Sequence, residues 1–176
     1  MIREYEAQLE TERALAKAEG RPHAVPCECA LLWDVGAPLP TLIQSDYVAH
    51  LFFDLRDDDD RVGHVRFDHL IATRFGPPND EALHGHPLFG SGLAFYSAMR
   101  VVDSPWIVQL ERLNSVHARH DPADYVAQQH FIFAFHDTMF ECVARSFSVS
   151  AVDRTMAEAV KDAVDLIFGP PILSGW

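Results

Sequence analysis

The stretch HFIFAFHDTMFECVARSF, residues 130–147, is the part of the chain on which the fold depends most. Apolar and polar side chains alternate before and after its centre, and alternation with a period of two is typical of β-strands. Only Asp137 and Thr138 separate the two runs, so we expect a β-hairpin with these residues as its loop. In that register the residue numbers of each pair across the hairpin add up to about 275. A four-residue loop centred on Asp137 and Thr138 would keep the same pairs.

The predicted hairpin has two unlike faces. One face, which we expect to lie in the core, carries Phe131, Phe133, Phe135, Phe140, Cys142 and Ala144. The other, which we expect to be half covered, carries His130, Ile132, Ala134, His136, Met139, Glu141, Val143 and Arg145. On this second face His136 and Glu141 are diagonal neighbours, roughly 7 Å apart between backbones.

Three side chains of the hairpin are candidates for catalysis. His136 is the candidate general base or metal ligand, Glu141 its partner, and Asp137 a third titratable group beside them. A half-buried carboxylate next to an imidazole favours pKa shifts and metal ligation; the alternative is an ion pair that satisfies two polar groups at a sheet edge. Cys142 is not favoured as a nucleophile, because a cysteine among phenylalanines behaves as a small hydrophobe with a raised pKa.

Residues 76–92 are the longest stretch without periodicity, and they include the pair His84 and His86 around Gly85. Long loops rich in glycine and proline are often functional, and an H-x-H pair suits contact with a metal or an anion. The alternative is that both rings bond to loop carbonyls. The candidate ligand-binding residues are Asn79, Asp80, His84, His86, His117 and His120. The candidate metal ligands are His84, His86 and His136, a set compatible with a divalent zinc, iron or manganese ion.

Three runs of the chain resemble a family of small, uncharacterised bacterial proteins. These runs are HGHPLFGSGL (84–93), NSVHARH (114–120) and HFIFAFHDTMFECVA (130–144), and the motifs H-G-H-P-L and F-H-D-x-x-F-E-C carry the resemblance most specifically. It covers roughly residues 76–147 and implies a shared domain. Since the family has no assigned activity, the resemblance transfers no catalytic role.

The length of 176 residues predicts one domain, residues 1–176, with a helical arm (1–20), a core (21–168) and a tail (169–176). The net charge of −12 argues against nucleic acid and anionic membranes as partners. No apolar run is long enough for a membrane helix, the N-terminus lacks the apolar core of a signal peptide, and three cysteines suggest no disulfide scaffold. We therefore expect a cytoplasmic, acidic protein, with a homodimer as one arrangement.

The other elements follow from periodicity and capping residues. Helices are expected at residues 2–19, 104–114, 121–129 and 150–168, the second with Trp106, Leu110 and Leu113 as its buried stripe and the last with a capping box at Ser150 and Asp153. Strands are expected at residues 27–35, 47–55, 62–71 and 93–102, with short extended pieces at 42–44 and 72–75. This order predicts an α+β fold: a single, largely antiparallel sheet with helices packed on one face, and a C-terminal β-hairpin followed by a helix.

A cupped sheet of this kind commonly encloses a small-molecule pocket. We expect a small-molecule-binding protein, and an enzyme that depends on a metal or on a His/Glu pair falls within that expectation. The alternative is a non-enzymatic accessory or regulatory protein that acts through protein–protein assembly. The lack of a standard catalytic motif, the acidic surface and the apolar segments at both ends favour this alternative.

Overall fold

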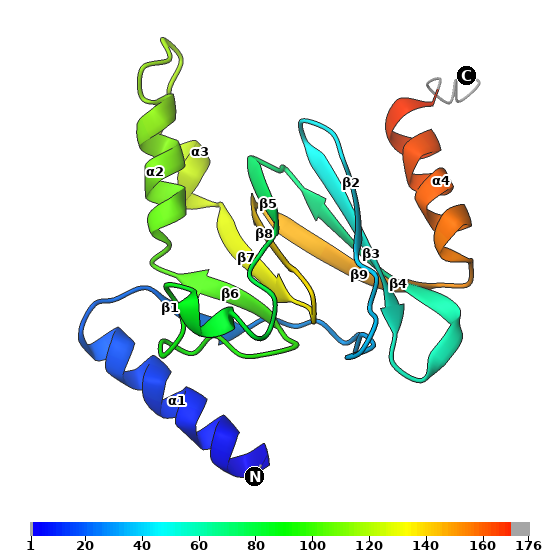
Figure 1. Ribbon diagram of the computed structural model, residues 1–176. Coiled ribbons are helices and arrows are strands. Elements are labelled where there is room, and N and C mark those ends of the chain that lie inside the picture. The colour runs from blue at the N-terminus through cyan, green and yellow to red at the C-terminus, as the bar shows by residue number, and fades with distance from the viewer. Residues whose placement is uncertain (1, 170–176) are drawn as a thin grey trace.

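The computed structural model describes residues 2–169, over which nine strands form two antiparallel sheets (Figure 1). Sheet A contains, in spatial order, β1 (His23–Pro26), β6 (Ala98–Val102), β7 (Gln129–Ala134), β8 (Met139–Ala144) and β5 (Ala72–Gly76). Sheet B contains β2 (Thr41–Gln44), β3 (Val48–Leu55), β4 (Asp58–Asp68) and β9 (Ser146–Val152). The helices are α1 (Ile2–Ala18), the 3-10 turn η1 (Leu83–Gly85), α2 (Pro105–Asn114), α3 (Ala123–Val126) and α4 (Met156–Phe168).

The predicted α+β class and the helix after the last strands are confirmed, but the prediction of a single sheet is wrong. Two of the expected long strands break and pass from one sheet to the other. Between β4 and β5 the chain bends at His69, whose φ of 53° lies in the left-handed region. At Arg145, sheet A ends with β8 and sheet B continues with β9. These two crossings let the apolar faces of the sheets pack against each other.

The largest core lies between the two sheets and contains the phenylalanine face of the hairpin, as predicted. Phe67 of β4 lies against Phe131, Phe133 and Phe140 of sheet A, with ring centroids 5.2 to 6.0 Å apart. The fully buried or nearly buried members from the hairpin are Phe131, Phe133, Phe135, Phe140, Cys142 and Ala144. Alternation along the hairpin therefore assigned this face correctly. The expectation that the opposite face is half covered is wrong, because Ile132, Ala134 and Met139 lie in a second core on the outer side of sheet A.

The predicted register of the hairpin is wrong by two residues. Phe133 pairs with Phe140 and Ile132 with Glu141, and the Phe135 N–H donates to the Thr138 carbonyl over 2.9 Å. The two-residue loop is thus His136 and Asp137. A shift of two keeps every side chain on its face, but the histidine diagonal to Glu141 becomes His130 instead of His136.

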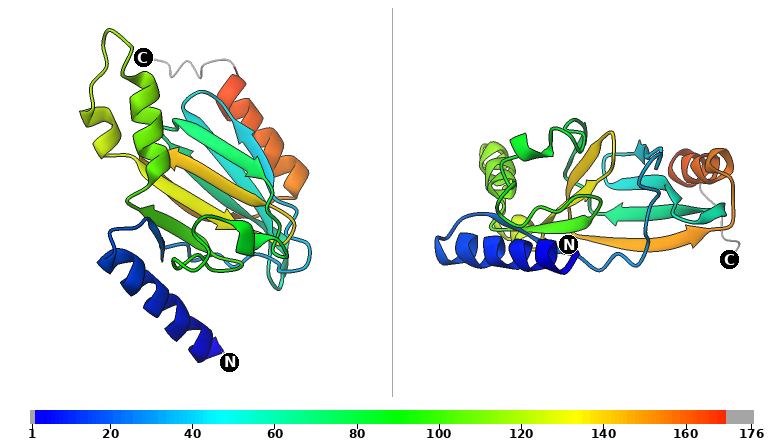
Figure 2. Two further views of the ribbon diagram at one scale, coloured as in Figure 1. Left: turned by 60° about the vertical axis from the view of Figure 1, so that its left-hand side comes forward. Right: turned by 60° about the horizontal axis from the view of Figure 1, so that its bottom comes forward.

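Helices cover the outer faces of both sheets, so the prediction that they pack on one face is also wrong. Leu9 of α1, together with loop residues such as Leu83 and Leu93, packs on the outer side of sheet A. Ala159 and Ala163 of α4 pack on the outer side of sheet B. Figure 2 shows α1 and α4 at opposite sides of the molecule.

Local capping chemistry explains where two of the helices begin. Ser104 is the N-cap of α2 and Pro105 its first residue, as predicted. The capping box of α4 is formed by Thr155 and Glu158, so the expected box at residues 150–153 is wrong. No helix among residues 2–169 is long and apolar enough to cross a membrane.

Other strand predictions need correction as well. Residues 27–35 contain no strand, only a bridge from Trp33 to Leu55, and the first strand is β1. The expected strand 93–102 shortens to β6. Residues 170–176, most of the expected tail, lie outside the described part of the chain.

Candidate functional site

A buried carboxylate lies at the centre of a polar cluster on the outer face of sheet A. Glu141 of β8 is 8% exposed and His130 of β7 is 4% exposed, although both are on a surface of the sheet. The Nε2–H of His130 donates to Oε2 of Glu141 over 2.9 Å, since a carboxylate can only accept. The other ring nitrogen, Nδ1, lies 2.9 Å from the Ser104 hydroxyl.

Ser104 links this cluster to the start of α2. Its Oγ accepts the backbone N–H of Ile107 over 3.4 Å as the N-cap, which leaves its hydroxyl proton free to donate to His130 Nδ1. The indole of Trp106, in the first turn of α2, stands edge-on to the His130 ring at a centroid distance of 5.1 Å. Both nitrogens of His130 are therefore engaged, and the ring is fixed in place.

The second carboxylate oxygen of Glu141 faces two further groups without a close hydrogen bond to either. Oε1 lies 3.8 Å from Nε2 of His86 and 3.9 Å from Nη1 of Arg74, beyond ordinary hydrogen-bond length. His86 Nδ1 accepts the Leu88 N–H over 3.2 Å, so in the neutral ring the proton is on Nε2 and points toward Glu141. Arg74 stacks over the Trp106 ring, 4.0 Å from its centroid.

The electrostatics of the cluster keep Glu141 ionised. Burial alone would raise the pKa of this carboxyl, but the hydrogen bond from His130 and the approach of His86 outweigh burial and lower the pKa to about 2. Glu141 is therefore a carboxylate throughout the physiological pH range.

The cluster forms one wall of a pocket of about 370 Å³ between sheet A, the loop at residues 77–91 and the start of α2. This volume is within the range of ordinary small-molecule sites. Its apolar lining is Pro22, Pro77, Pro78, Pro87, Leu88, Val101, Pro105 and Trp106. Its polar lining is Arg21, Arg74, His86, Ser91, His130 and Glu141.

Three of the sequence-predicted residues form a separate cluster at the hairpin tip. His136 Nδ1 bonds to Asp137 over 2.9 Å, and its Nε2 lies 3.8 Å from Asp80. The Tyr96 hydroxyl donates to Asp80. The bond to Asp137 raises the pKa of His136, and the bond to Asp80 raises the pKa of Tyr96 to about 12.

The remaining candidates do not join either cluster. Asn79 accepts the Ala82 N–H within its own loop, and the His84 ring lies against Phe89. His120 bonds to Glu111 over 2.8 Å, and His117 accepts the N–H of Arg119. Of the predicted site residues, the pocket thus brings together only His86 and Glu141.

The predicted metal ligands His84, His86 and His136 do not converge. Among residues 2–169, no group of three or more His, Cys, Asp or Glu side chains is arranged to hold a metal ion. His86 faces Glu141, whereas His136 faces Asp80 and Asp137.

Sequence reasoning missed His130, Ser104, Arg74 and Trp106 as site residues. For His130 a signal was present: Thr138 is β-branched and better suited to a strand than to a loop. Moving the loop back to His136 and Asp137 would have made His130 the diagonal neighbour of Glu141. No local pattern in the sequence indicates that Arg74 lies near Glu141, because this contact depends on the pairing of β5 with β8.

Comparisons of the chain with protein-family models, with curated proteins and with solved structures found no match. The resemblance to small bacterial proteins therefore stays a prediction. The fold and the site define an α+β protein with a pocket of mixed apolar and polar lining on the outer face of one sheet.

Proposed function

We propose that the protein binds a small organic molecule in the pocket beside Glu141. The observation that carries this proposal is the environment of Glu141 Oε1. This oxygen belongs to an ionised carboxylate that lines the pocket, and it faces His86 Nε2 and Arg74 at 3.8 and 3.9 Å, too far for a close hydrogen bond to either. A ligand hydroxyl or amide suits this gap, because it can donate to Oε1 and accept from the His86 N–H or from Arg74.

The charges around the pocket favour a ligand that is also an anion. Arg21 and Arg74 line it against the single carboxylate of Glu141, in a chain whose net charge is −12. Arg21 is partly balanced by Glu19, at 2.6 Å, whereas Arg74 is about half exposed and 3.9 Å from its nearest carboxylate oxygen. Prolines and Trp106 provide apolar contact for the rest of the ligand.

The cluster suits recognition better than proton transfer. An efficient general base has a pKa near the working pH, and Glu141, with a pKa of about 2, is far below it. His130 has both nitrogens engaged, and His86 has Nδ1 engaged. We therefore propose binding as the function of this site.

Ligand-observed NMR with mandelate, hippurate and 4-hydroxyphenylacetate tests the proposal. These probes combine a carboxylate, a hydroxyl or amide, and an aromatic body. At least one is expected to bind, and Arg74→Ala is expected to weaken that binding tenfold or more, because it removes a guanidinium that lines the pocket and is only loosely paired with Glu141. Asp137→Asn, at the separate hairpin-tip cluster, is the matched control and should bind as the wild type does. Absence of binding by all three probes, or equal binding by Arg74→Ala, contradicts the proposal.

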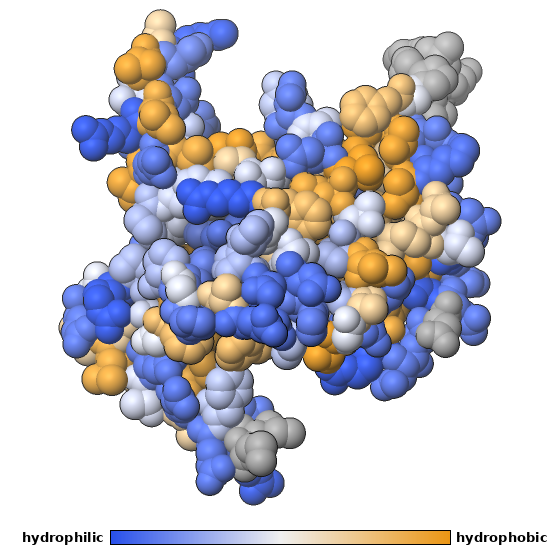
Figure 3. Space-filling model, in the orientation of Figure 1, coloured by the Kyte–Doolittle hydropathy of each residue, from blue (hydrophilic) through white to orange (hydrophobic). Residues whose placement is uncertain are grey.

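A second candidate, self-assembly through α2, is favoured by the exposure of its apolar residues. Trp106 is buried, but Val108 and Leu113 are 65% and 66% exposed, so the expected buried stripe does not extend along the helix. Figure 3 shows apolar side chains gathered on α2, which projects from the sheets. Exposed apolar patches often mark interfaces, and here we propose a second copy of the chain as the partner. Sedimentation equilibrium should show a dimer that Leu113→Lys dissociates, and a monomeric wild type would exclude this candidate.

A further inference from the structure

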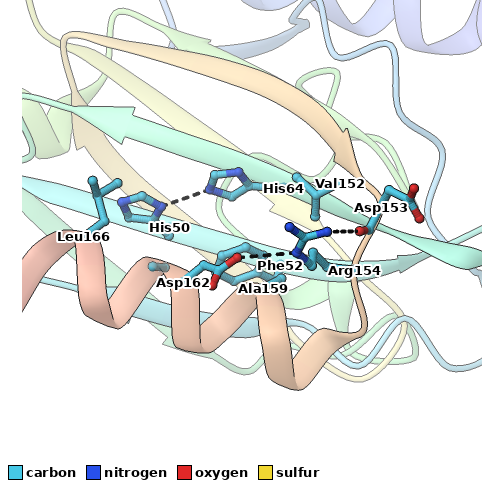
Figure 4. A pocket seen from close by; sticks show the side chains of 10 residues that line it. His50, Phe52, His64, Val152, Asp153, Arg154, Ala159, Asp162 and Leu166 are labelled. Carbon is cyan, nitrogen blue, oxygen red and sulfur yellow. Dashed lines mark hydrogen bonds and ion pairs between the residues drawn. The ribbon is translucent and has the colours of Figure 1, made fainter.

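A second cavity, of about 410 Å³, lies between α4 and the outer face of sheet B (Figure 4). Its floor is formed by His50 and Phe52 of β3 and by His64 of β4, and α4 forms the opposite wall with Ala159 and Ala163. The small side chains of these two alanines leave the space open. Since an apolar cavity of roughly 150 Å³ can hold benzene, this cavity has room for a substituted aromatic ring.

Two stacked histidines are the unusual feature of the floor. The rings of His50 and His64 are 5.1 Å apart and within 9° of parallel, and Nδ1 of His50 lies 2.9 Å from Nε2 of His64. Only one proton can occupy this short contact. The Nδ1 of His64 lies 3.4 Å from the Ser150 hydroxyl, so both nitrogens of His64 have neighbours.

The remaining nitrogen of the pair, Nε2 of His50, has no hydrogen-bond partner although His50 is 2% exposed. Buried side-chain nitrogens without a partner are uncommon. Depending on which ring holds the shared proton, this nitrogen is either a donor or an acceptor. A hydroxyl group complements both forms, because it can accept as well as donate.

The electrostatics of the cavity argue against a charged ligand. Burial and the neighbouring His50 lower the pKa of His64 to about 4, and burial with Arg66 lowers that of His50, so both rings are neutral at pH 7. The only cation in the lining, Arg154, pairs with Asp162 at 3.7 Å and donates to the Asp153 carbonyl (Figure 4). The two carboxylates outnumber it, so an anion finds no unpaired positive charge here.

We propose that this cavity is a second binding site, for a neutral aromatic alcohol, separate from the pocket beside Glu141. The ring of the ligand lies against Phe52 and the two alanines of α4. Its hydroxyl bonds to Nε2 of His50. The two sites therefore select ligands of different charge on opposite sides of the sheet pair.

Titration of the protein with p-cresol at pH 7, followed by the ring resonances of His50 and His64 in NMR spectra, tests the proposal. Saturable shifts of these resonances are expected. p-Xylene, which has the same shape without the hydroxyl, should bind at least tenfold more weakly, and 4-methylbenzoate should not bind. This comparison uses only the wild-type protein, so it does not depend on the folding of any variant.

Two variants and one control sharpen the test. Ala163→Phe fills the cavity and should abolish binding of p-cresol, and His50→Phe keeps a ring but should remove the preference for p-cresol over p-xylene. Arg74→Ala, in the other pocket, should leave binding of p-cresol unchanged. The proposal is overturned by absence of saturable shifts, by equal binding of p-xylene, or by saturable binding of 4-methylbenzoate.

Discussion

Replacement of Glu141 by glutamine is expected to destabilise the protein more strongly at neutral pH than in acid. Glutamine has nearly the same size and keeps an oxygen that can accept from His130, but it removes the charge. The wild-type carboxylate is 8% exposed and accepts the His130 N–H over 2.9 Å. The difference between the two proteins therefore measures the stabilisation that ionised Glu141 gains in the fold.

The size and sign of this difference follow from the pKa of Glu141. Folding lowers that pKa from 4.5 to about 2, and at about 1.36 kcal/mol per pKa unit this corresponds to about 3 kcal/mol of the free energy of unfolding at pH 7. Because the folded pKa is the lower one, the stabilisation is complete above pH 4.5 and is lost as the pH falls toward 2. By the same relation, less than half of this stabilisation should remain at pH 3.

Urea unfolding followed by tryptophan fluorescence at pH 7 and at pH 3 measures both values. Comparison of wild type and variant at each pH cancels the titration of groups that do not interact with Glu141. Glu6→Gln, at an exposed position of α1, is the control and should differ little from the wild type at either pH. A difference for Glu141→Gln that is the same at both pH values would refute the reasoning, as would a variant as stable as the wild type at pH 7.

Three further predictions concern other parts of the fold. Ser104→Ala removes the cap of α2 and the hydroxyl beside His130, so it should lower the free energy of unfolding by about 1–2 kcal/mol. Ser104→Thr should recover most of this loss. An alanine variant as stable in urea as the wild type would exclude a stabilising cap. Gly63→Ala would place a Cβ 2.2 Å from the Phe53 ring, so calorimetry should show destabilisation by about 1–3 kcal/mol, and an unchanged melting temperature would contradict this close contact. Cys142 is fully buried and burial raises its pKa well above the usual value. Iodoacetamide should therefore leave it unmodified in peptide mass maps until urea unfolds the chain, and labelling at the rate of an exposed thiol would argue against this placement.

The candidate site shows how far local reasoning extends. Glu141 and His86 were identified from their residue types and from the motifs around them, and both line the pocket. His130 was placed on the correct face but was not chosen, because the loop was assigned to Asp137 and Thr138. Arg74 could not be chosen at all, since it approaches Glu141 only through the pairing of β5 with β8.

Alternation within residues 130–147 determined by itself which side chains of the hairpin share a face, because the side-chain period of a strand is local and survives a shift of two residues. That the second face is buried as well was decided by the loop residues and α1 that cover it. Capping chemistry likewise determined the start of α2 at Ser104. The partners across the hairpin, the division of the strands into two sheets and the chain crossings at His69 and Arg145 were decided only by the tertiary structure. These features depend on contacts between residues far apart in the chain, and no local pattern specifies which distant strand a given strand will pair with.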